Sequence, residues 1–335
     1  MVKILLFADT HLGFDHPVRE VSLRPRRGID FFKNYKRILK YALDNDVDLL
    51  VHGGDFFFRS KVPPKIVTEV YEILFQFAEK GIPIVIVPGN HERSILPDSF
   101  LTRHPNIYIF AEEGQFSFEL KGHQFELYGF PFIRNNIDEE FPRIVERFKS
   151  KLNPDHYNLL CLHQAIEGSR VEKYTFRKGP DVISFKDIPD CFNVVFSGHI
   201  HRHQILWKHT SDKQIPVVYP GSTERTSFQE KNEIKGFYQL GIEFNNQKDY
   251  CSKFSFIELP TRDMVDLGIP GEIADRDSFE KWLRHAVSNI AANSILRFRG
   301  MNRTNKDFIS NKYLKEILHD DMIVQFAGKR LTNNY

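Results

Sequence analysis

The sequence predicts an α/β fold in which a mixed sheet sandwich is flanked by helices and followed by a small C-terminal α/β domain. In the first half of the 335-residue chain, short apolar runs alternate with amphipathic segments, the pattern of strands and helices layered around buried sheets. From residue 216 to 259 the pattern is more purely β, so we expect two layers of sheet. Composition changes near Pro260. Because single cores seldom grow beyond about 250–300 residues, we predict two domains, 1–260 and 261–335.

Short apolar runs predict the strands of the larger domain. They are Val2–Ala8, Val47–His52, Ile84–Val87, Leu159–His163, Val194–Ser197, Pro216–Tyr219, Phe237–Phe244 and Phe254–Leu259. A further pair, Phe116–Leu120 and Gln124–Tyr128, is joined through Lys121–Gly122 and predicts a hairpin.

Helices are expected between these strands. The segment from Phe31 to Asn45 has apolar residues on one face, and a second helix begins at Pro63–Pro64 and stops at Gly81. Beyond Pro260 the expected order is strand, helix, strand, short helix and strand. The ranges are Asp263–Ile269, Asp277–Ile290, Ile295–Arg299, Lys312–Leu318 and Met322–Phe326. This order fits a compact α/β domain of about 75 residues.

Composition argues against a membrane or a disulfide-stabilised protein. The sequence is 41% hydrophobic and 27% charged, and no apolar stretch approaches the roughly 18 residues that cross a bilayer. Asp9 and His11 interrupt the N-terminal apolar run, so we interpret it as a first strand and not as a secretion signal. The three cysteines are widely spaced and odd in number, as is typical of a reducing compartment. We therefore expect a cytoplasmic location.

The charge is unevenly distributed although the net charge is only +2. Between Pro17 and Lys40 there are eight basic residues and two acidic ones, in a segment that begins shortly after His11. A solvated loop leading into a helix would explain such a cluster by itself. Its position beside the histidine motif described next also predicts contact with a polyanion.

Five motifs carry the predicted chemistry, and each directly follows a predicted strand. They are Asp9-Thr10-His11, Gly54-Asp55, Gly89-Asn90-His91-Glu92, His163 and Gly198-His199-Ile200-His201. Strand ends are where α/β sheets place their ligand sites. Carboxylate, imidazole and amide ligands without a thiolate suit a catalytic divalent metal such as manganese, iron or zinc, and argue against a structural zinc site.

Each motif alone has an ordinary structural explanation. An Asp-x-His occurs by chance, a single histidine at a strand end is usually a hydrogen-bonded core residue, and Gly-Asn-His can be a turn. Five of them in this order, each at a strand terminus, are not explained in that way. The set resembles the calcineurin-like metallophosphoesterases, whose pattern is D-x-H, G-D, G-N-H, H and G-H-x-H.

The resemblance implies how two divalent metal ions are held. Asp9, His11, Asp55 and His201 would bind one ion, and Asp55, Asn90, His163 and His199 the other, with the Asp55 carboxylate between them. Manganese is the expected metal, with iron, zinc and magnesium as alternatives. The resemblance further implies a hydroxide shared by both metals as the nucleophile and His91 as the general acid that protonates the leaving alkoxide.

A more specific resemblance narrows the substrate to DNA. The runs Ser197–Gln204, Tyr219–Phe228 and Lys235–Phe237 are similar to the SbcD-type DNA repair exonucleases, which process double-strand breaks with an SMC-like ATPase. The resemblance covers about the first 260 residues, and the C-terminal part has the element order of that family's capping domain. It implies DNA and an SbcC-type ATPase as partners. Candidate substrate-binding residues are Arg26, Arg27, Arg59, Arg93, Ser222, Thr223 and Arg225.

The sequence departs from that family in three places. Many members have a histidine three residues after the Gly-Asp aspartate, associated with exonuclease activity, where this chain has Phe58. This departure weakens the expectation of exonuclease action more than that of endonuclease action, and endonuclease action, exonuclease action or both stay open. The connection from His11 to Phe31 is longer and more basic than usual. The segment 93–98, which in the family leads into a dimer-forming helix, is short and contains a proline, so both a homodimer and a monomer remain open.

Two alternatives to a DNA nuclease stay open at this point. The same fold serves phosphatases and cyclic-nucleotide phosphodiesterases with small substrates, because fold does not fix substrate. A DNA-binding scaffold subunit with a vestigial metal site is the other alternative. Intact ligands at every matched position argue against it.

Overall fold

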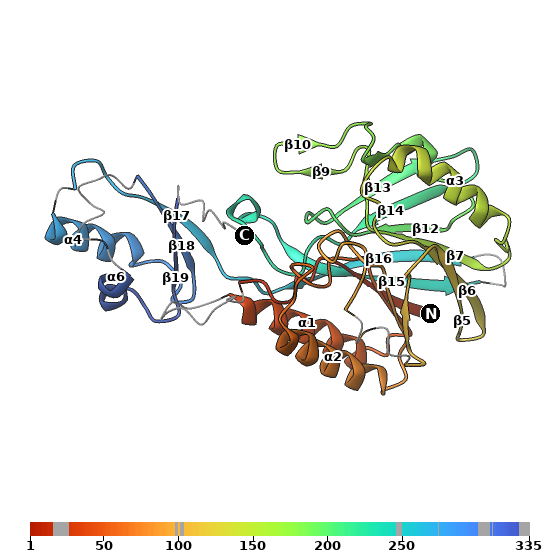
Figure 1. Ribbon diagram of the computed structural model, residues 1–335, viewed down its shortest axis with the longest axis horizontal. Coiled ribbons are helices and arrows are strands. Elements are labelled where there is room, and N and C mark those ends of the chain that lie inside the picture. Colours follow the sequence, from red (N-terminus) through yellow and green to blue (C-terminus); the bar gives the residue numbers. More distant parts are fainter. Residues whose placement is uncertain are drawn as a thin grey trace. The chain divides into compact units, whose positions relative to one another are not determined.

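The chain folds into two compact units in a computed structural model (Figure 1), which describes residues 1–15, 27–97, 100, 104–245, 250–273, 275–300, 309 and 311–327. The larger unit comprises Met1–Phe14, Gly28–Thr226 and Asn232–Pro260. The smaller comprises Ser227–Lys231 and the described residues from Thr261 onward, together with Asp15 and Arg27. Within the described part of the chain, none of the helices combines the length and the apolar character needed to span a bilayer.

The first sheet of the larger unit has the strand order β16-β15-β1-β2-β3-β4. Its strands are β1 (Val2–Phe7), β2 (Leu49–His52), β3 (Ile84–Ile86), β4 (Ile107–Ile109), β15 (Lys235–Phe244) and β16 (Tyr250–Leu259). Strands β1 to β4 are parallel, and β15 joins β1 antiparallel. Leu5 and Phe7 pack against the helices α1 (Gly28–Asp44) and α2 (Pro64–Ala78).

The second sheet has the order β13-β14-β12-β7-β6-β5. Its strands are β5 (Gly114–Leu120), β6 (His123–Gly129), β7 (Tyr157–Leu162), β12 (Val194–Ser197), β13 (Gln204–His209) and β14 (Gln214–Tyr219). The central strands are parallel, and β5 and β13 are antiparallel to their neighbours. One face packs on Ile4 and Leu6 of β1, and the other on α3 (Ile137–Lys149). The unit is therefore a sandwich of two mixed sheets between helices, as predicted.

Short elements follow β7 in the chain. They are β8 (Ala165–Ile166), β9 (Arg170–Val171), β10 (Tyr174–Thr175), β11 (Val182–Ile183) and the 3-10 turn η2 (Phe185–Asp187). A second 3-10 turn, η3 (Phe228–Glu230), belongs to the smaller unit. None of these short elements carries one of the five motifs.

The smaller unit is built on a parallel sheet of order β17-β18-β19. Its elements are β17 (Met264–Gly268), α4 (Arg276–Val287), β18 (Ile295–Arg299), α6 (Asn311–Ile317) and β19 (Ile323–Phe326). Leu296 and Phe298 point to the face that packs on α4 and α6, and Ile295 points to the other face. The predicted element order is confirmed. The roles of the two domains, nuclease and cap, stay predictions.

Candidate metal centre

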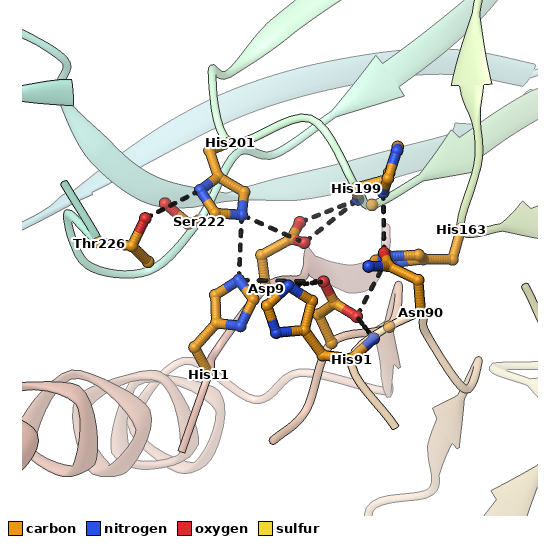
Figure 2. Close-up of polar contacts among 12 residues, drawn as sticks. Asp9, His11, Asn90, His91, His163, His199, His201, Ser222 and Thr226 are labelled. Atoms are coloured by element: carbon orange, nitrogen blue, oxygen red, sulfur yellow. Dashed lines mark hydrogen bonds and ion pairs between the residues drawn. The ribbon is translucent and has the colours of Figure 1, made fainter. Parts of the chain in front are cut away.

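The five motifs lie at the carboxyl ends of strands from both sheets. Asp9 and His11 follow β1, Asp55 follows β2, Asn90 and His91 follow β3, His163 follows β7, and His199 and His201 follow β12. These strands are parallel within each sheet, so the loops that follow them emerge at the same edge. Figure 2 shows the resulting cluster, in which side chains from both sheets point toward one another.

The backbone at this edge is held in a conformation that side chains rarely adopt. Four predicted ligands have positive φ: Asp9 at 52°, His11 at 44°, Asp55 at 54° and His199 at 80°. Each such residue costs on the order of 1 kcal/mol or more, and it persists only where neighbouring structure enforces it. Here Asp9 N–H donates to Gly54 O at 2.9 Å, and His11 N–H donates to Asp55 O at 3.0 Å. The two loops therefore fix each other.

One group of ligand atoms gathers around His11 and His201. The two Nε2 atoms lie 3.0 Å apart, and His201 Nε2 lies 3.8 Å from Asp9 Oδ1 (Figure 2). His11 Nε2 is 3.9 Å from Asp55 Oδ2. Two nitrogens about 3 Å apart have the spacing of adjacent ligands on one metal ion with bonds of about 2.1 Å. The Asp9 carboxylate is aimed by His199 N–H, which donates to its oxygens at 3.1 and 3.2 Å.

The second group gathers around Asn90. Its Oδ1 lies 3.0 Å from His163 Nε2 and 2.9 Å from His199 Nδ1 (Figure 2). His163 Nε2 is also 3.4 Å from Asp55 Oδ1. Asp55 thus directs one carboxylate oxygen to each group. The structure brings together all seven residues that the sequence predicts as metal ligands.

The donor set of the second group fits a cation. His163 Nδ1 lies 2.6 Å from Gly53 O, which can only accept, so Nδ1 donates and Nε2 of the neutral ring carries a lone pair. That lone pair faces the oxygens of Asn90 and Asp55. Three electron-rich atoms converge in a buried place, an arrangement that a positive charge would stabilise. A divalent metal ion would supply that charge.

The metal-free titration behaviour of the centre follows from the same arrangement. Burial opposes a charged His163, but Asp55 and Asp9 outweigh it and raise the pKa of His163 to about 9. Burial would raise the pKa of Asp55 as well, yet the imidazoles of His163, His11 and His91 hold that pKa below its usual value. Burial raises the pKa of Asp9 to about 6. Without metal, a proton on His163 therefore replaces part of the missing positive charge.

His91 is oriented by its backbone neighbours. Its Nδ1 lies 2.5 Å from Phe58 O and donates to it, which leaves Nε2 facing the centre at 3.8 Å from Asp55 Oδ2 (Figure 2). The His91 side chain is 34% exposed. With His11 and Asp55 it forms a group whose ligand atoms all lie within 4.8 Å of one another. This position suits a proton donor at the mouth of the site, and it also lies within reach of a metal ion.

Phe58 forms part of the wall beside His91. Its ring centroid lies 5.7 Å from that of His91, 5.9 Å from that of His11 and 4.7 Å from that of Phe14. An apolar ring therefore stands where many members of the SbcD-type family have an imidazole. It can shape the opening but can neither bind a metal nor carry a proton.

Two buried residues that hold the centre were not singled out from the sequence. Glu92 accepts hydrogen bonds from Phe57 N–H at 2.6 Å and from Gly89 N–H at 2.9 Å, and burial raises its pKa to about 8. It joins the loop of Asp55 to the loop of Asn90. The only sequence signal was its place directly after Asn90-His91.

His52 is the second of these residues. Its Nδ1 accepts from Gly54 N–H at 3.2 Å, and because an amide can only donate, the neutral ring carries its proton on Nε2. That proton is donated to Thr10 Oγ1 at 3.0 Å, and the hydroxyl donates to Phe56 O at 3.0 Å. Burial lowers the pKa of His52 to about 3. The chain of three bonds ties the Asp9–His11 loop to the Asp55 loop.

The candidate substrate-binding residues differ in how far their side chains are exposed to solvent. Ser222 and Thr223 are fully buried, and Ser222 Oγ donates to Glu224 O at 2.9 Å. Arg225 is half-buried and its Nε donates to Glu233 O at 3.0 Å. Contact of this turn with a phosphate would therefore involve backbone groups more than side chains.

The basic candidates also differ from one another. Arg93 is exposed, Arg59 is half-buried and Arg27 is buried. Arg26 lies outside the described residues, as does the part of the basic segment from 17 to 26. Along α1, Lys33 and Lys36 are exposed, while Lys40 pairs with Asp44 at 2.7 Å. The basic residues of α1 thus form a solvated helix face, whereas Arg27 before the helix is buried.

The fold and the centre together define the class of the protein. A sandwich of two mixed sheets that carries His, Asp and Asn ligands at its strand ends is a metallophosphoesterase with a candidate dimetal site. The profile of the calcineurin-like phosphoesterase family matches residues 2–203, more than half of the chain. The chain belongs to this family.

Three proteins that are similar to this chain, at 26% or 27% identity, share one name, DNA double-strand break repair protein Mre11. The protein from Archaeoglobus fulgidus is 26% identical over 288 residues, which cover 81% of this chain and 62% of that protein. The protein from Methanocaldococcus jannaschii is 27% identical over 95% of this chain and 82% of its own length. The protein from Saccharolobus solfataricus is 27% identical, over 72% of this chain and 58% of its own length. The chain thus spans about three fifths of two of these relatives.

Proposed function

We propose that this protein is a two-metal phosphodiesterase that cleaves DNA, of the double-strand-break repair type. The observation that carries the hydrolase part is the Asp55 carboxylate, which directs one oxygen to each of two converging ligand groups. DNA as the substrate is supported by the name that the archaeal relatives share and by the Gly221–Phe228 run. A partner ATPase of the SbcC type, a cytoplasmic location and a capping role for 261–335 belong to the same proposal.

The residues divide between two metal sites. Asp9, His11, His201 and Asp55 would hold one divalent ion, and Asp55, Asn90, His163 and His199 the other. Bound ions would withdraw charge from the phosphate oxygens and lower the pKa of the attacking water. Manganese is the ion we propose, because oxygen and imidazole ligands in this mixture suit it, with iron, zinc and magnesium as alternatives.

The protein's own contribution is orientation and proton transfer. His91 donates through Nδ1 to Phe58 O, so a proton on Nε2 points into the centre and can pass to the leaving alkoxide. His163 is held by the hydrogen bond that its Nδ1 donates to Gly53 O, His199 by its contact with Asn90, and Asp9 by the His199 amide. The ligands are thus in place before substrate arrives, which limits reorganisation during the reaction.

Phe58 favours endonuclease over exonuclease action. Its ring lies beside His91, so no second imidazole stands at this point to act on a strand end. We therefore expect internal cleavage of single-stranded and hairpin DNA to exceed the resection of blunt ends.

The test is cleavage of supercoiled, hairpin, single-stranded and blunt DNA by the purified protein with added manganese. We expect cleavage that chelation abolishes and that Asp55→Asn eliminates. Exposed Asp212, at the tip between β13 and β14, offers the matched control Asp212→Asn, which should cleave normally. Equal cleavage by Asp55→Asn would contradict the proposal. Turnover of small esters without any cleavage of DNA would identify a small-substrate phosphatase instead.

A further inference from the structure

A cavity of about 540 Å³ opens next to the loop that carries His91. Its walls come from the loop after β2, from α2 and from the segment that follows His91. The lining residues that matter are Lys61, Val62, Val67, Arg93, Ile95 and Leu96. No residue of the predicted metal set lines it, so it is a separate feature of the surface.

The wall of this cavity is apolar. Val62 and Val67 pack against the core beneath the first sheet, and Leu96 is buried within that core. Ile95 is 69% exposed, more than any other large hydrophobic residue among those the structure describes. An apolar side chain left in water beside an apolar wall is a surface that a flat apolar ligand would cover favourably.

The rim of the cavity is cationic. Lys61 and Arg93 are both exposed, and neither forms an ion pair with any residue in the described part of the chain. Arg93 and Ser94 have φ of 55° and 66°, a turn that is held by Arg93 N–H to Asn90 O at 3.1 Å and Ser94 N–H to Gly89 O at 2.9 Å. The backbone of Arg93 is thus held at the rim in a conformation that side chains rarely adopt.

The cavity and the metal centre are connected through the buried side chain of Glu92. Glu92 lines the cavity, and its carboxylate holds the amides of Phe57 and Gly89, which neighbour the predicted ligands Asp55 and Asn90. Arg93 follows His91 by two residues, so their Cα atoms lie within about 7 Å. This is the range of one or two nucleotides along a strand whose cleaved phosphate is at the centre.

We infer that this cavity binds the base of a nucleotide next to the phosphodiester that is cleaved. The base lies against Val62, Val67 and Ile95, and flanking phosphates contact Lys61 and Arg93. A flat apolar group joined to an anion is the ligand that an apolar wall with a cationic rim recognises, and base stacking of this kind tolerates any sequence. The inference rests on the proposed DNA substrate and adds where the strand is held.

The test combines a change in the protein with a change in the DNA. Single-stranded DNA that carries an abasic residue beside the preferred cleavage position is compared with intact DNA, using the unaltered protein and Ile95→Ser. For the unaltered protein, we expect loss of that base to raise KM about tenfold, in the range of one base contact. For Ile95→Ser, KM for intact DNA should already be raised, and removing the base should add little.

Controls separate this inference from the proposed function. Leu43→Ser removes another exposed apolar side chain, on α1, and should leave both substrates unchanged. Manganese titration should give equal affinity for Ile95→Ser and the unaltered protein, because no residue of the predicted metal set lines the cavity. The inference is overturned if the unaltered protein cleaves DNA but Ile95→Ser and the abasic residue raise KM independently of each other. The proposed function then stands.

Two further outcomes are informative. Absence of any metal-dependent DNA cleavage by the unaltered protein overturns the proposed function and this inference with it. Light scattering of the unaltered protein and Ile95→Ser measures whether a second copy covers the cavity instead. A dimer that Ile95→Ser dissociates, with no base effect on KM, would overturn the inference in favour of a protein interface.

Discussion

Asp55 directs Oδ1 toward His163 and Oδ2 toward His11, and also accepts the His91 amide through Oδ1 at 2.9 Å. Asp55→Asn keeps an acceptor but removes the negative charge that both metal sites would share. We expect manganese affinity to fall by at least about 100-fold, since loss of even an outer-shell partner costs 10–100-fold. Isothermal titration of manganese measures it, with Asp212→Asn as the control. Unchanged affinity for both ions would exclude Asp55 as the shared ligand.

Substitution of His91 distinguishes a proton donor from a metal ligand at this position. His91→Asn should lower kcat on a phosphodiester with an alkoxide leaving group by about 10²–10⁴, because the leaving oxygen then departs unprotonated. The loss should be much smaller with p-nitrophenolate, which needs no acid. Manganese affinity is measured alongside kcat. Equal losses on both esters, together with weaker manganese binding, would make His91 a ligand instead.

His52 should make the protein sensitive to acid. Its folded pKa is lowered to about 3 while the unfolded chain has the ordinary value of 6.5. Its contribution to stability is therefore complete above pH 6.5 and is lost as pH falls from 6.5 toward 3, because only the unfolded chain takes up the proton. The loss is on the order of 2 kcal/mol at pH 5.

Denaturant unfolding of the protein and of His52→Gln across pH 5–7 measures this effect. The glutamine amide can still donate to Thr10 but does not titrate. The variant should be less stable at pH 7 and lose less stability on acidification. Parallel pH profiles for the two proteins would show that His52 is not the titrating group.

Much of the site at this scale could be predicted from sequence, because metal ligands need particular residue types at strand ends. All seven predicted ligands lie in one cluster. Glu92 and His52 could not be recognised, since their partners are backbone amides of Gly89 and Gly54 that become neighbours only on folding. His52 is the last residue of the apolar strand β2, a position where a histidine by itself indicates no function.

At the scale of elements, glycines at the strand ends allow the loops to approach. A Cβ on Gly89 would lie 2.3 Å from both the backbone nitrogen and Oδ1 of Asp55, which is closer than atoms can come. Gly89→Ala should therefore displace the Asp55 loop, lower stability by about 1–3 kcal/mol and weaken manganese binding.

Gly268→Ala is the matched control for this substitution. Gly268 lies at the end of β17, and a Cβ there would meet nothing within 4 Å. Thermal unfolding and manganese titration of the two variants compare them directly. If Gly89→Ala binds manganese as tightly as the control does, the close approach of the two loops is not required.

The strands β2, β7 and β12 were predictable because buried parallel strands are short and almost wholly apolar. The edge strands β4 and β13 are only partly buried and were not predicted. Helix α3 was not predicted. It contains Pro142, which normally disfavours a helix interior, yet Phe141, Ile144, Val145 and Phe148 still form a buried face. Packing on the second sheet outweighs the lost hydrogen bond. The two-residue strands β8 to β11 are too short to leave a periodic pattern.

For the whole molecule, 46 basic and 44 acidic residues nearly cancel, so DNA affinity must come from local groups of cations. Binding to single-stranded DNA should weaken as salt rises, with a slope of log K against log salt of about −0.7 per phosphate contacted. Fluorescence anisotropy with single-stranded DNA at several salt concentrations, without metal, measures the slope. Binding that is independent of salt would exclude a protein that follows the phosphate backbone.

Arg93 should contribute one phosphate contact to the salt dependence of DNA binding. Because its side chain has no ion-pair partner among the described residues, Arg93→Gln removes an unpaired cation and should reduce the magnitude of the slope by about 0.7, the share of one phosphate contact. Lys253→Gln, which removes an exposed cation from β16, is the matched control for net charge. If both variants shift affinity equally, the field of the whole protein governs binding. If only Arg93→Gln changes the slope, a phosphate is bound beside the metal centre.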